Sequence, residues 1–546
     1  MKKLLTLAVA IMLTATMFAG GLVTNTNQSA TWVRLPARDA STSIDAAYFN
    51  PAGLMKLENG FHLSLSNQTI IQNREITNDY DLLNNDVFTG EVFAPAFPSV
   101  YAVYKMDKLA FSFGVNIIGG GGSADFASGL PSFEMGPSEL VPALASQGVE
   151  EYRLDASFEG TSAFFGYQGG VSYKINDMIS VFAGVRYVSA KNTYNGYLRD
   201  VEISPVGGTW MRADAFFTGA AAQVTQIKGI PTSLAPVITA TGGAITLDQA
   251  VAGVPGFEEA NKAAIIAGLA GIGVDEATAL AMDLNTISGA VTTATPTLDA
   301  TIAQYTATST LLNDKEADVE QTATGITPIV GVNISPSENL NIGIKYEFAT
   351  ELEFTNVVND DKDILLAFTP TGDAVYMFND GSTFRGDMPA MLSLGVDYGV
   401  SEKLGVSVGT HYYFDKTADY GKKIDGVVVP NEDVIDNNFL EVAAGVEYAL
   451  NEKLVVSTGF LMAKTGANED YQSDLSYSLT SNTIGLGAGY KLNDMMMLNL
   501  GFGYTMYTAA SKSMERLLPD GLTTLQAVET YNKDNMFVAV GLDFSF

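Results

Sequence analysis

Apolar and polar residues alternate one by one along most of this chain of 546 residues. In the stretch 496–507, MMLNLGFGYTMY, the large residues Leu498, Leu500 and Phe502 fall on one side and the residues between them fall on the other. A period of two is that of a β-strand, because successive side chains point to opposite faces. Fourteen such segments can be placed, at residues 60–74, 97–106, 109–119, 155–174, 179–197, 321–335, 339–357, 383–400, 403–416, 437–450, 453–466, 477–491, 495–509 and 535–546.

The connections between these segments alternate strictly between short polar turns, such as Asn451-Glu452, and long loops, the longest at 198–320. This alternation is typical of a transmembrane β-barrel, in which closure of the sheet leaves no unpaired edge in lipid. A soluble β-sandwich or β-repeat protein is the alternative, but its loops need not alternate in length. We therefore predict an all-β fold, a 14-stranded antiparallel transmembrane β-barrel at residues 60–546 with its apolar faces toward lipid.

Both ends of the chain are typical of an outer-membrane protein. Residues 1–20 combine two lysines, an apolar run and a small-residue exit, as a secretory signal peptide does, and we expect cleavage at or beside Gly20. A retained N-terminal anchor is the alternative. No other stretch is apolar for long enough to form a spanning helix. The last residue is Phe546, the usual end of an outer-membrane barrel, through which we expect contact with the barrel assembly machinery.

Charge and residue content argue against several classes of function. The formal net charge of −31 argues against a nucleic-acid partner. Cysteine is absent, and the two histidines, His62 and His411, belong to strands far apart in the predicted order. The sequence therefore offers no metal site, no cofactor site and no compact catalytic set, so that we expect no enzyme activity.

The segment 21–59 has neither a strand pattern nor a place in the loop alternation. It closes with the motif Phe49, Asn50, Pro51, Ala52 and Gly53. Fourteen strands about 4.8 Å apart and tilted by about 40° enclose a lumen on the order of 28 Å across, which wall side chains do not fill. We predict that this segment folds back as a plug, with a turn set by the proline and the glycine and with Asn50 capping the local backbone. A plain turn after a disordered tail is the alternative.

The long loop is rich in Ala, Thr and Gly and carries helix signals. Residues 246–249 look like a capping box, and 257–270 and 275–287 are predicted to form helices with one apolar face. The insertion 205–320 is either a packed extracellular cap or a ligand-capture groove, and the two are compatible because packed helices leave apolar grooves. The candidate groove residues are Ile265, Ile266, Leu269, Leu280, Leu284 and Ile287.

Strand three ends in four consecutive glycines, Gly119, Gly120, Gly121 and Gly122. Glycine weakens strand pairing and permits a bend. This run is either a kink in the barrel wall or a flexible start to the second long loop.

Several of these segments resemble the FadL/TodX type of outer-membrane transporters for hydrophobic compounds. The resemblance includes DASTSIDAAYFNPAGL before strand one, and it continues through most of the chain outside the long loops. The further matching stretches are PSVYAVYKMDKLAFSFGVN, YKINDMISVFAGVRY, GVNISPSENLNIGIKYEF, MPAMLSLGVDYGVSEKLGVSVGTHYYF and FVAVGLDFSF.

The resemblance implies a barrel with an N-terminal hatch that contains residues 49–53. It also implies passive transport of long-chain fatty acids or hydrocarbons, with capture among the outer loops, an interior pocket and lateral exit at a kinked third strand. Because the strong negative charge of the protein repels a carboxylate, neutral hydrocarbons are candidate ligands beside fatty acids. We expect a monomer in contact with outer-membrane lipid and lipopolysaccharide, with acidic loops as possible sites for divalent cations. A porin-like channel for polar solutes is the alternative function.

Overall fold

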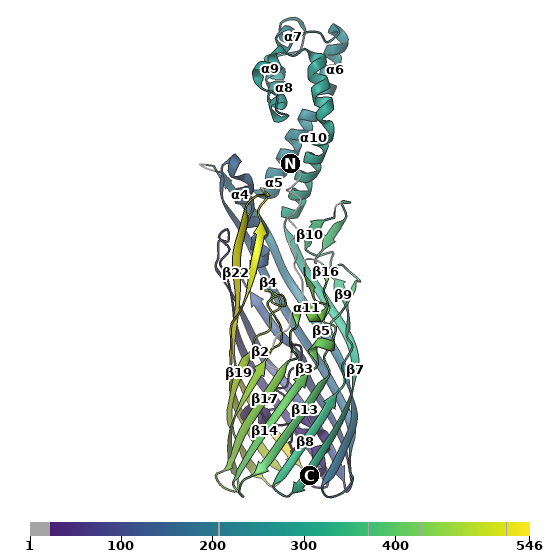
Figure 1. Ribbon diagram of the computed structural model, residues 1–546, viewed down its shortest axis with the longest axis vertical. Coiled ribbons are helices and arrows are strands. Elements are labelled where there is room, and N and C mark those ends of the chain that lie inside the picture. Colours follow the sequence, from purple (N-terminus) through teal and green to yellow (C-terminus); the bar gives the residue numbers. More distant parts are fainter. Residues whose placement is uncertain (1–21, 206–207, 370, 425–426, 520) are drawn as a thin grey trace.

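The computed structural model describes residues 22–205, 208–369, 371–424, 427–519 and 521–546. The predicted signal peptide lies outside the described residues. Fourteen antiparallel strands form a closed barrel, which confirms the predicted fold class (Figure 1). In chain order the wall consists of β1 (Gly60–Asn78), β2 (Val87–Met106), β3 (Leu109–Phe126), β4 (Val149–Lys174), β5 (Ile179–Pro205), β7 (Lys315–Ser337), β8 (Leu340–Glu347) with its continuation β9 (Glu353–Val358), β12 (Thr383–Arg385) with its continuation β13 (Met391–Gly399), β14 (Leu404–Tyr413), β17 (Leu440–Ala449), β18 (Leu454–Lys464), β19 (Ser481–Asn493), β20 (Met496–Tyr507) and β22 (Thr524–Ser545).

The barrel closes because the last strand pairs with the first. β22 runs antiparallel to β1 from the pair His62 and Ser545 to the pair Asn78 and Glu529. Six further short strands in the described part of the chain lie outside the wall sequence or extend its rim: β6 (Met211–Arg212), β10 (Leu365–Phe368), β11 (Ala374–Tyr376), β15 (Lys423–Ile424) with β16 (Val427–Val428) as a small hairpin, and β21 (Ala510–Leu517) against the outer part of β22.

The outward face of the wall changes from apolar to polar along each strand. On β7 the outward residues Ile326 and Val330 are apolar and exposed, whereas Glu316 and Glu320 near the outer end are charged. A strand crosses lipid in about 9–11 residues. The charged outer part of the wall, including the start of β7, therefore stands outside the bilayer.

The long loop between β5 and β7 forms a helical stalk with a small head, which rises from the outer rim (Figure 1). The stalk consists of α5 (Ala213–Lys228) packed against α10 (Leu284–Leu312). The head contains α6 (Ile230–Thr241), α7 (Leu247–Gly253), α8 (Glu259–Gly271) and α9 (Glu276–Ala281). The capping box before α7 is present. The Thr246 side chain accepts a hydrogen bond from the backbone N–H of Gln249, and the Gln249 side chain accepts one from the backbone N–H of Thr246. None of the described helices is long and apolar enough to span a membrane.

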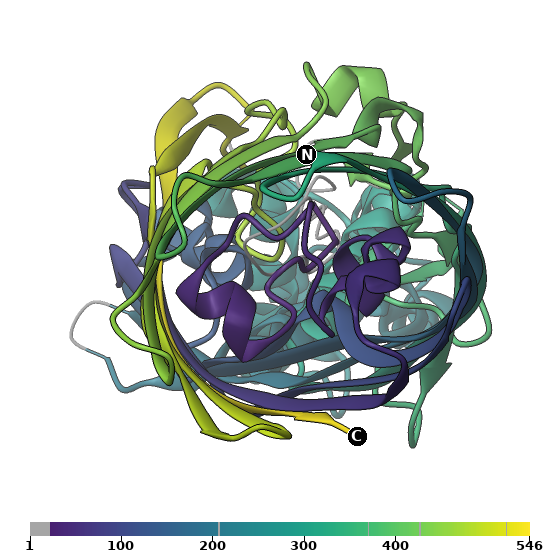
Figure 2. The same ribbon diagram turned by 90° about the horizontal axis from the view of Figure 1, so that it is seen from below.

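The segment before β1 folds into the lumen, where Figure 2 shows it inside the ring of strands. We call residues 22–57 the hatch. It contains α1 (Ala30–Arg34), α2 (Ala46–Phe49) and the 3-10 helix η1 (Pro51–Lys56). The remaining short helices belong to the outer loops: α3 (Pro131–Ser138), α4 (Leu140–Leu144), η2 (Ala145–Gln147), η3 (Asp415–Thr417) and α11 (Asn431–Val434).

Candidate functional site

The wall has a break between β2 and β3. Their paired residues jump from Glu91 and Asp125 to Ser99 and Asn116, so that residues 92–98 and 117–124 have no partner on the other strand. On β2 this segment contains two prolines, at positions 95 and 98, which have no N–H to donate. Sequence composition thus explains one side of the break.

On β3 the break coincides with the glycine run. Gly120 and Gly122 have φ angles of 88° and 69°, a backbone region that residues with a Cβ rarely adopt. The pairing of β3 with β4 also shifts register on both sides of Gly119. The glycine run therefore lies within β3, at a point where its pairing shifts register, while its roles as a kink in the wall and as an exit remain predictions.

The first described residues of the hatch lie against this break from inside the barrel. The backbone N–H of Asn25 donates to the carbonyl of Ile118 at 2.7 Å, and its side chain donates to the carbonyl of Gly120 at 3.1 Å. Thr24 forms an isolated antiparallel bridge with Gly119. The hatch thus forms hydrogen bonds with β3 in the segment where β3 is not paired with β2.

Gly119 is required by this contact. A Cβ at that position would lie 2.5 Å from the carbonyl oxygen of Val23 and 2.8 Å from the ring of Phe164. Only glycine therefore permits the hatch backbone and β3 to approach so closely.

The motif at residues 49–53 holds the base of the hatch to the wall strands β4, β5 and β7. The predicted capping role of Asn50 is wrong, because its side chain makes no cap and instead donates to the carbonyl of Val332 at 3.0 Å. The carbonyls of Pro51 and Ala52 accept from Ser172 and Ser180, at 2.6 and 2.7 Å. The motif thus uses its backbone carbonyls as acceptors for wall hydroxyls.

The other two motif residues are constrained by packing. Phe49 is buried and meets the ring of Tyr48 edge-on at 5.1 Å. Gly53 lies in η1, where a Cβ would come within 2.2 Å of the carbonyl oxygen of Ser41. A larger residue at position 53 would push two parts of the hatch apart.

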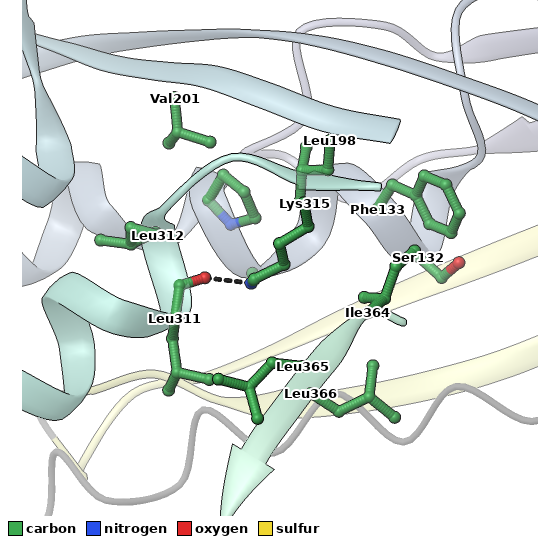
Figure 3. Close-up of a pocket in the computed structure, with 12 residues that line it drawn as sticks. Ser132, Phe133, Leu198, Val201, Leu311, Leu312, Lys315, Ile364, Leu365 and Leu366 are labelled. Atoms are coloured by element: carbon green, nitrogen blue, oxygen red, sulfur yellow. Dashed lines mark hydrogen bonds between the residues drawn. The ribbon is translucent and has the colours of Figure 1, made fainter. Parts of the chain in front are cut away.

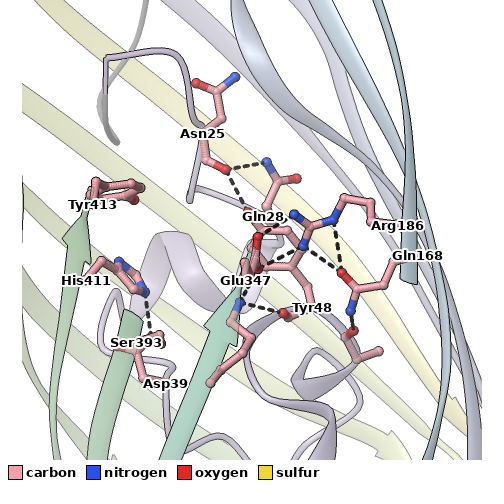
Figure 4. A network of polar contacts seen from close by, with 12 residues as sticks. Asn25, Gln28, Asp39, Tyr48, Gln168, Arg186, Glu347, Ser393, His411 and Tyr413 are labelled. Atoms are coloured by element: carbon pink, nitrogen blue, oxygen red, sulfur yellow. Dashed lines mark hydrogen bonds and ion pairs between the residues drawn. The ribbon is translucent and has the colours of Figure 1, made fainter. Parts of the chain in front are cut away.

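A charged network connects the middle of the hatch to the wall (Figure 4). Arg186 of β5 pairs with Glu347 of β8 at 2.5 Å, and Lys345 binds the same carboxylate at 2.6 Å. Lys345 also donates to the backbone carbonyl of Tyr48 at 3.1 Å, while Gln168 donates to that of Ala47 at 2.7 Å. Two wall cations that share one carboxylate, together with Gln168, thus anchor α2.

A second link is made by His411, which bridges hatch and wall (Figure 4). Its Nε2 lies 2.6 Å from Asp39 of the hatch, and its Nδ1 lies 2.7 Å from Glu441 of β17. Ser393 donates to the same Asp39 carboxylate at 2.6 Å. These polar contacts can be exchanged for water or ligand contacts, whereas the apolar packing of hatch residues such as Trp32 against wall residues such as Phe537 must separate if the hatch moves.

An apolar pocket lies at the outer rim, between α3, the end of α10 and β10 (Figure 3). Its volume is about 50 Å³, and its apolar walls include Phe133, Leu198, Val201, Leu312, Ile364 and Leu366.

The one lysine of this pocket is Lys315, whose Nζ donates to the backbone carbonyl of Leu311. Burial alone lowers the pKa of its ammonium to about 8, and no carboxylate in the described part of the chain pairs with it. The pocket therefore offers a partly desolvated cation among apolar walls.

The predicted groove residues lie in the head, apart from this pocket. Leu269, Leu284 and Ile287 are fully buried in the core of the head, while Ile266 and Leu280 are partly buried. Ile265 also lines a cavity of about 510 Å³ between α6 and α8. Five of the six residues, all but Leu280, thus belong to the apolar core of the head, and Ile265 also lines the cavity.

Sequence reasoning missed the cation of the rim pocket and the prolines of the break. Lys315 stands at the junction of α10 and β7, a junction that the predicted helices and strands did not define. Pro95 and Pro98 precede or interrupt the alternating pattern of β2, and a pair of prolines at a strand start was the available signal. Among the described residues, no group of three His, Asp or Glu side chains is arranged to hold a metal ion.

The chain was compared with known families, sequences and structures. The family model described as "Outer membrane protein transport protein (OMPP1/FadL/TodX)" matches residues 268–546, just over half of the chain. No curated protein sequence matches the chain.

Among solved structures, a Pseudomonas aeruginosa FadL homologue is 14% identical with a TM-score of 0.57, over 98% of this chain and 100% of that one. The Pseudomonas putida toluene transporter TodX is 13% identical with a TM-score of 0.49, over 93% and 95%. The Ralstonia pickettii toluene transporter TbuX is 16% identical with a TM-score of 0.44, over 92% and 94%. At 14% identity, the likeness to the P. aeruginosa protein shows a shared fold alone.

Proposed function

Because the chain belongs to the OMPP1/FadL/TodX family of outer-membrane transport proteins, we propose that it carries long-chain fatty acids passively across the outer membrane. The proposed route has four steps: capture at the outer rim, passage to the interior, rearrangement of the hatch, and lateral exit beside β3. The observation that carries this proposal is the break between β2 and β3, which the hatch covers from inside.

A lateral exit suits a hydrophobic solute for a physical reason. Burial of ten methylenes is favourable by about 8 kcal/mol at about 0.8 kcal/mol each. A solute released into the periplasm would lose that energy to water, whereas one that leaves sideways keeps its chain in an apolar environment. Phe93, a residue of the break, is 63% exposed, which supports an exit toward lipid at this place.

The rim pocket supports an anionic ligand over a neutral one. Lys315 is the cation among its apolar walls, and a charge-assisted hydrogen bond from it would satisfy a carboxylate head group. The pocket of about 50 Å³ accommodates only the head of such a ligand, so that the tail must follow neighbouring apolar surface. Neutral hydrocarbons are the second candidate class of ligand, and they would make no use of the Lys315 ammonium. A comparison of the rates at which cells take up oleate and hexadecane distinguishes the two classes.

The hatch must move for the route to open, and a covalent lock tests this. Asn27 of the hatch donates to Gln68 of β1 at 3.2 Å, and the chain has no native cysteine. We expect the pair Asn27→Cys and Gln68→Cys, joined by a short bifunctional thiol reagent, to abolish oleate uptake by cells. The same variant before joining should transport normally.

A matched control joins two wall strands and leaves the hatch free. The hydroxyls of Thr483 and Thr505 lie 2.8 Å apart on neighbouring strands. The pair Thr483→Cys and Thr505→Cys, treated in the same way, should take up oleate at the wild-type rate. Undiminished uptake by the joined hatch variant would contradict hatch movement.

A porin-like channel for polar solutes is not favoured, because hatch residues 22–57 occupy the lumen. Conductance in planar bilayers tests this alternative, since an open channel would pass steady large currents.

The remaining assignments are proposals that rest on the family. We propose that the barrel is a monomer in contact with lipopolysaccharide and that the assembly machinery engages Phe546. Phe546 is 61% exposed and therefore available for such a contact. The groove in the head also remains a prediction.

A further inference from the structure

The helical head contains a cavity that is much larger than the rim pocket. It lies between α6 and α8 and has a volume of about 510 Å³. Sites for small molecules have volumes of roughly 300–1,000 Å³. We call it the head cavity, and its floor consists of four buried side chains, those of Ile230, Leu234, Phe257 and Ile265. The head thus has room for a small molecule over an apolar surface.

The packing of the helices keeps this space open. α6 packs against α10, whereas α8 packs against α5 and α9. Two glycines bring α8 against the end of α5 and the start of α6. A Cβ at Gly268 would lie 2.7 Å from Cδ1 of Ile230, and one at Gly271 would lie 2.8 Å from Cδ1 of Ile227. Beyond these contacts α6 and α8 rest on different neighbours, and the space between them is not filled.

The head cavity is remote from the transport route. α10 has 29 residues and is therefore ~43 Å long at about 1.5 Å per residue. Leu284 and Ile287, at its start, are buried in the core of the head, whereas Leu312, its last residue, lines the rim pocket. Figure 1 shows the head at the far end of the stalk from the barrel. A molecule in the head cavity therefore does not occupy the rim pocket.

The head cavity has no charge to offer a ligand. Among the described residues that line it, none is charged. The lysines of the helices that border it are already paired, Lys228 with Asp299 at 2.5 Å and Lys262 with Asp248 at 2.7 Å and Glu259 at 3.3 Å. An ionic group would lose water in the cavity without gaining a counter-charge, which is unfavourable. The cavity therefore favours an uncharged ligand.

The rim of the cavity offers hydrogen bonds. Gln223 and Gln226 of α5 are exposed at the rim, and neither side-chain amide has a partner among the described residues. Asn261 of α8 accepts from the backbone N–H of Glu258 at 2.9 Å through its Oδ1, which leaves its Nδ2 free to donate. A glutamine amide can both donate and accept. An uncharged ligand with a polar group can thus pair with the rim while its apolar body covers the floor.

We propose that the head cavity binds an uncharged amphipathic small molecule on the outer side of the membrane, a function separate from transport through the barrel. The apolar body of the ligand lies on the floor beside the ring of Phe257, and its hydrogen-bonding group meets the amides of Gln223 and Gln226. This proposal does not depend on the proposed function, because the transported fatty acid is an anion whose head group is assigned to Lys315.

The test uses a matched pair of fluorescent probes. Phenylnaphthylamine is uncharged and carries one N–H group, and anilinonaphthalenesulfonate has the same skeleton with an added sulfonate. The two molecules therefore differ in the one property that the cavity is expected to discriminate.

Because the chain has no native cysteine, a single thiol can report on the cavity. Ala264→Cys places the thiol on α8 at the cavity, and Ala222→Cys, the control, places it at an exposed position of α5 that does not line the cavity. The rate at which N-ethylmaleimide alkylates each thiol is measured by mass spectrometry on the full chain in a non-ionic detergent. Each probe is present at a free concentration that is set by dialysis.

We expect saturating phenylnaphthylamine to slow the alkylation of Ala264→Cys at least tenfold, because a bound molecule covers the thiol. Alkylation of Ala222→Cys should not change. Anilinonaphthalenesulfonate at the same free concentration should slow the alkylation of either variant less than twofold.

A second pair of variants fills the cavity or leaves it open. Ala267→Trp, combined with Ala264→Cys, places an indole in the cavity, whereas Ala263→Trp in the same background places it at an exposed position of α8 that does not line the cavity. Protection by phenylnaphthylamine should be lost in the first and retained in the second. Cells with either variant should take up oleate at the wild-type rate, and circular dichroism verifies that the helices are retained.

Equal protection of Ala264→Cys by the two probes would overturn the assignment to an uncharged ligand. Absence of protection, or undiminished protection in the variant with Ala267→Trp, would overturn the site and leave the proposed function intact. Loss of oleate uptake with Ala267→Trp but not with Ala263→Trp would overturn the separation of the cavity from transport. Absence of oleate uptake by wild-type cells would refute the proposed function alone.

Discussion

The substitution Lys315→Met separates the charge of the rim pocket from its apolar character. Methionine keeps an unbranched apolar chain but removes the ammonium. A hydrogen bond to a charged group contributes about 1.5–3 kcal/mol, which corresponds to roughly a tenfold to hundredfold change in affinity. At pH 7 we therefore expect rim-site affinity for oleate to fall by this factor and affinity for oleyl alcohol to stay the same.

The dependence on pH has a definite sign. Burial lowers the pKa of Lys315 to about 8, so that the ligand-free ammonium is about 90% charged at pH 7 and about 3% charged at pH 9.5. Oleate affinity of the wild type should fall as the pH rises through this range, since the cationic form binds the carboxylate. Lys315→Arg, which stays charged, should show no such fall.

Equilibrium binding of radiolabelled oleate and oleyl alcohol, with detergent-only blanks, measures these effects. Lys228→Met is the matched control, because Lys228 is an exposed lysine of the same stalk that pairs with Asp299. Equal losses for the acid and the alcohol would refute the carboxylate reasoning, since they would show that the substitution only distorts the pocket.

Three further predictions concern the hatch, one outer loop and the C-terminus. Gly119→Val forces the hatch backbone away from β3 at an overpacking cost of about 1–3 kcal/mol, and cells should become more sensitive to vancomycin. Gly219→Val, at a site where a Cβ meets nothing within 4 Å, should have no effect, and equal sensitivity of the two would contradict the contact. Burial lowers the pKa of Lys422 to about 7, so the packing of loop 414–439 should become more stable as the pH rises from about 7 to about 10.5, because only the open loop binds the proton there. Hydrogen exchange of the loop, corrected for intrinsic rates, should show this dependence in the wild type and lose it in Lys422→Met; the same dependence in both would exclude Lys422 as its origin. Phe546→Ser should lower the amount of assembled barrel in membranes severalfold without changing refolding in detergent, and unchanged assembly would argue against recognition of that residue.

The barrel could be predicted because its signal is local. In the membrane-spanning part of each strand, every second residue faces lipid and is apolar. A few neighbouring residues, such as Leu498 and Leu500, are enough to show this pattern. The capping box at Thr246 is local in the same way. The outer parts of β1, β2, β4, β5, β7 and β22 extend beyond the predicted segments, because the pattern there is the reverse of the lipid-facing one: apolar residues such as Ala317 and Val319 of β7 face inward, and the outward face is polar.

The contacts of the site could not be predicted, because they join residues that are distant in sequence. Asp39 and His411 come into contact only when the hatch folds into the lumen of the barrel. Asn50 has the residue type of a local cap, but a wall carbonyl at Val332 is a competing acceptor for its side-chain N–H. The stalk was missed for a different reason: the Ala- and Thr-rich sequence of α10 has no narrow apolar stripe, and its partner α5 lies far away in the chain.

Lateral exit of the ligand between β2 and β3 can be observed directly by photoaffinity labelling. Cells that express the protein are given palmitate with a diazirine on its tail and are irradiated, and labelled residues are mapped by mass spectrometry. We predict label on outward-facing residues beside the break, Phe93 and Ile117, and loss of that label when the hatch is joined to β1. Label confined to residues of the lumen and the periplasmic mouth, with none at the break, would contradict lateral exit.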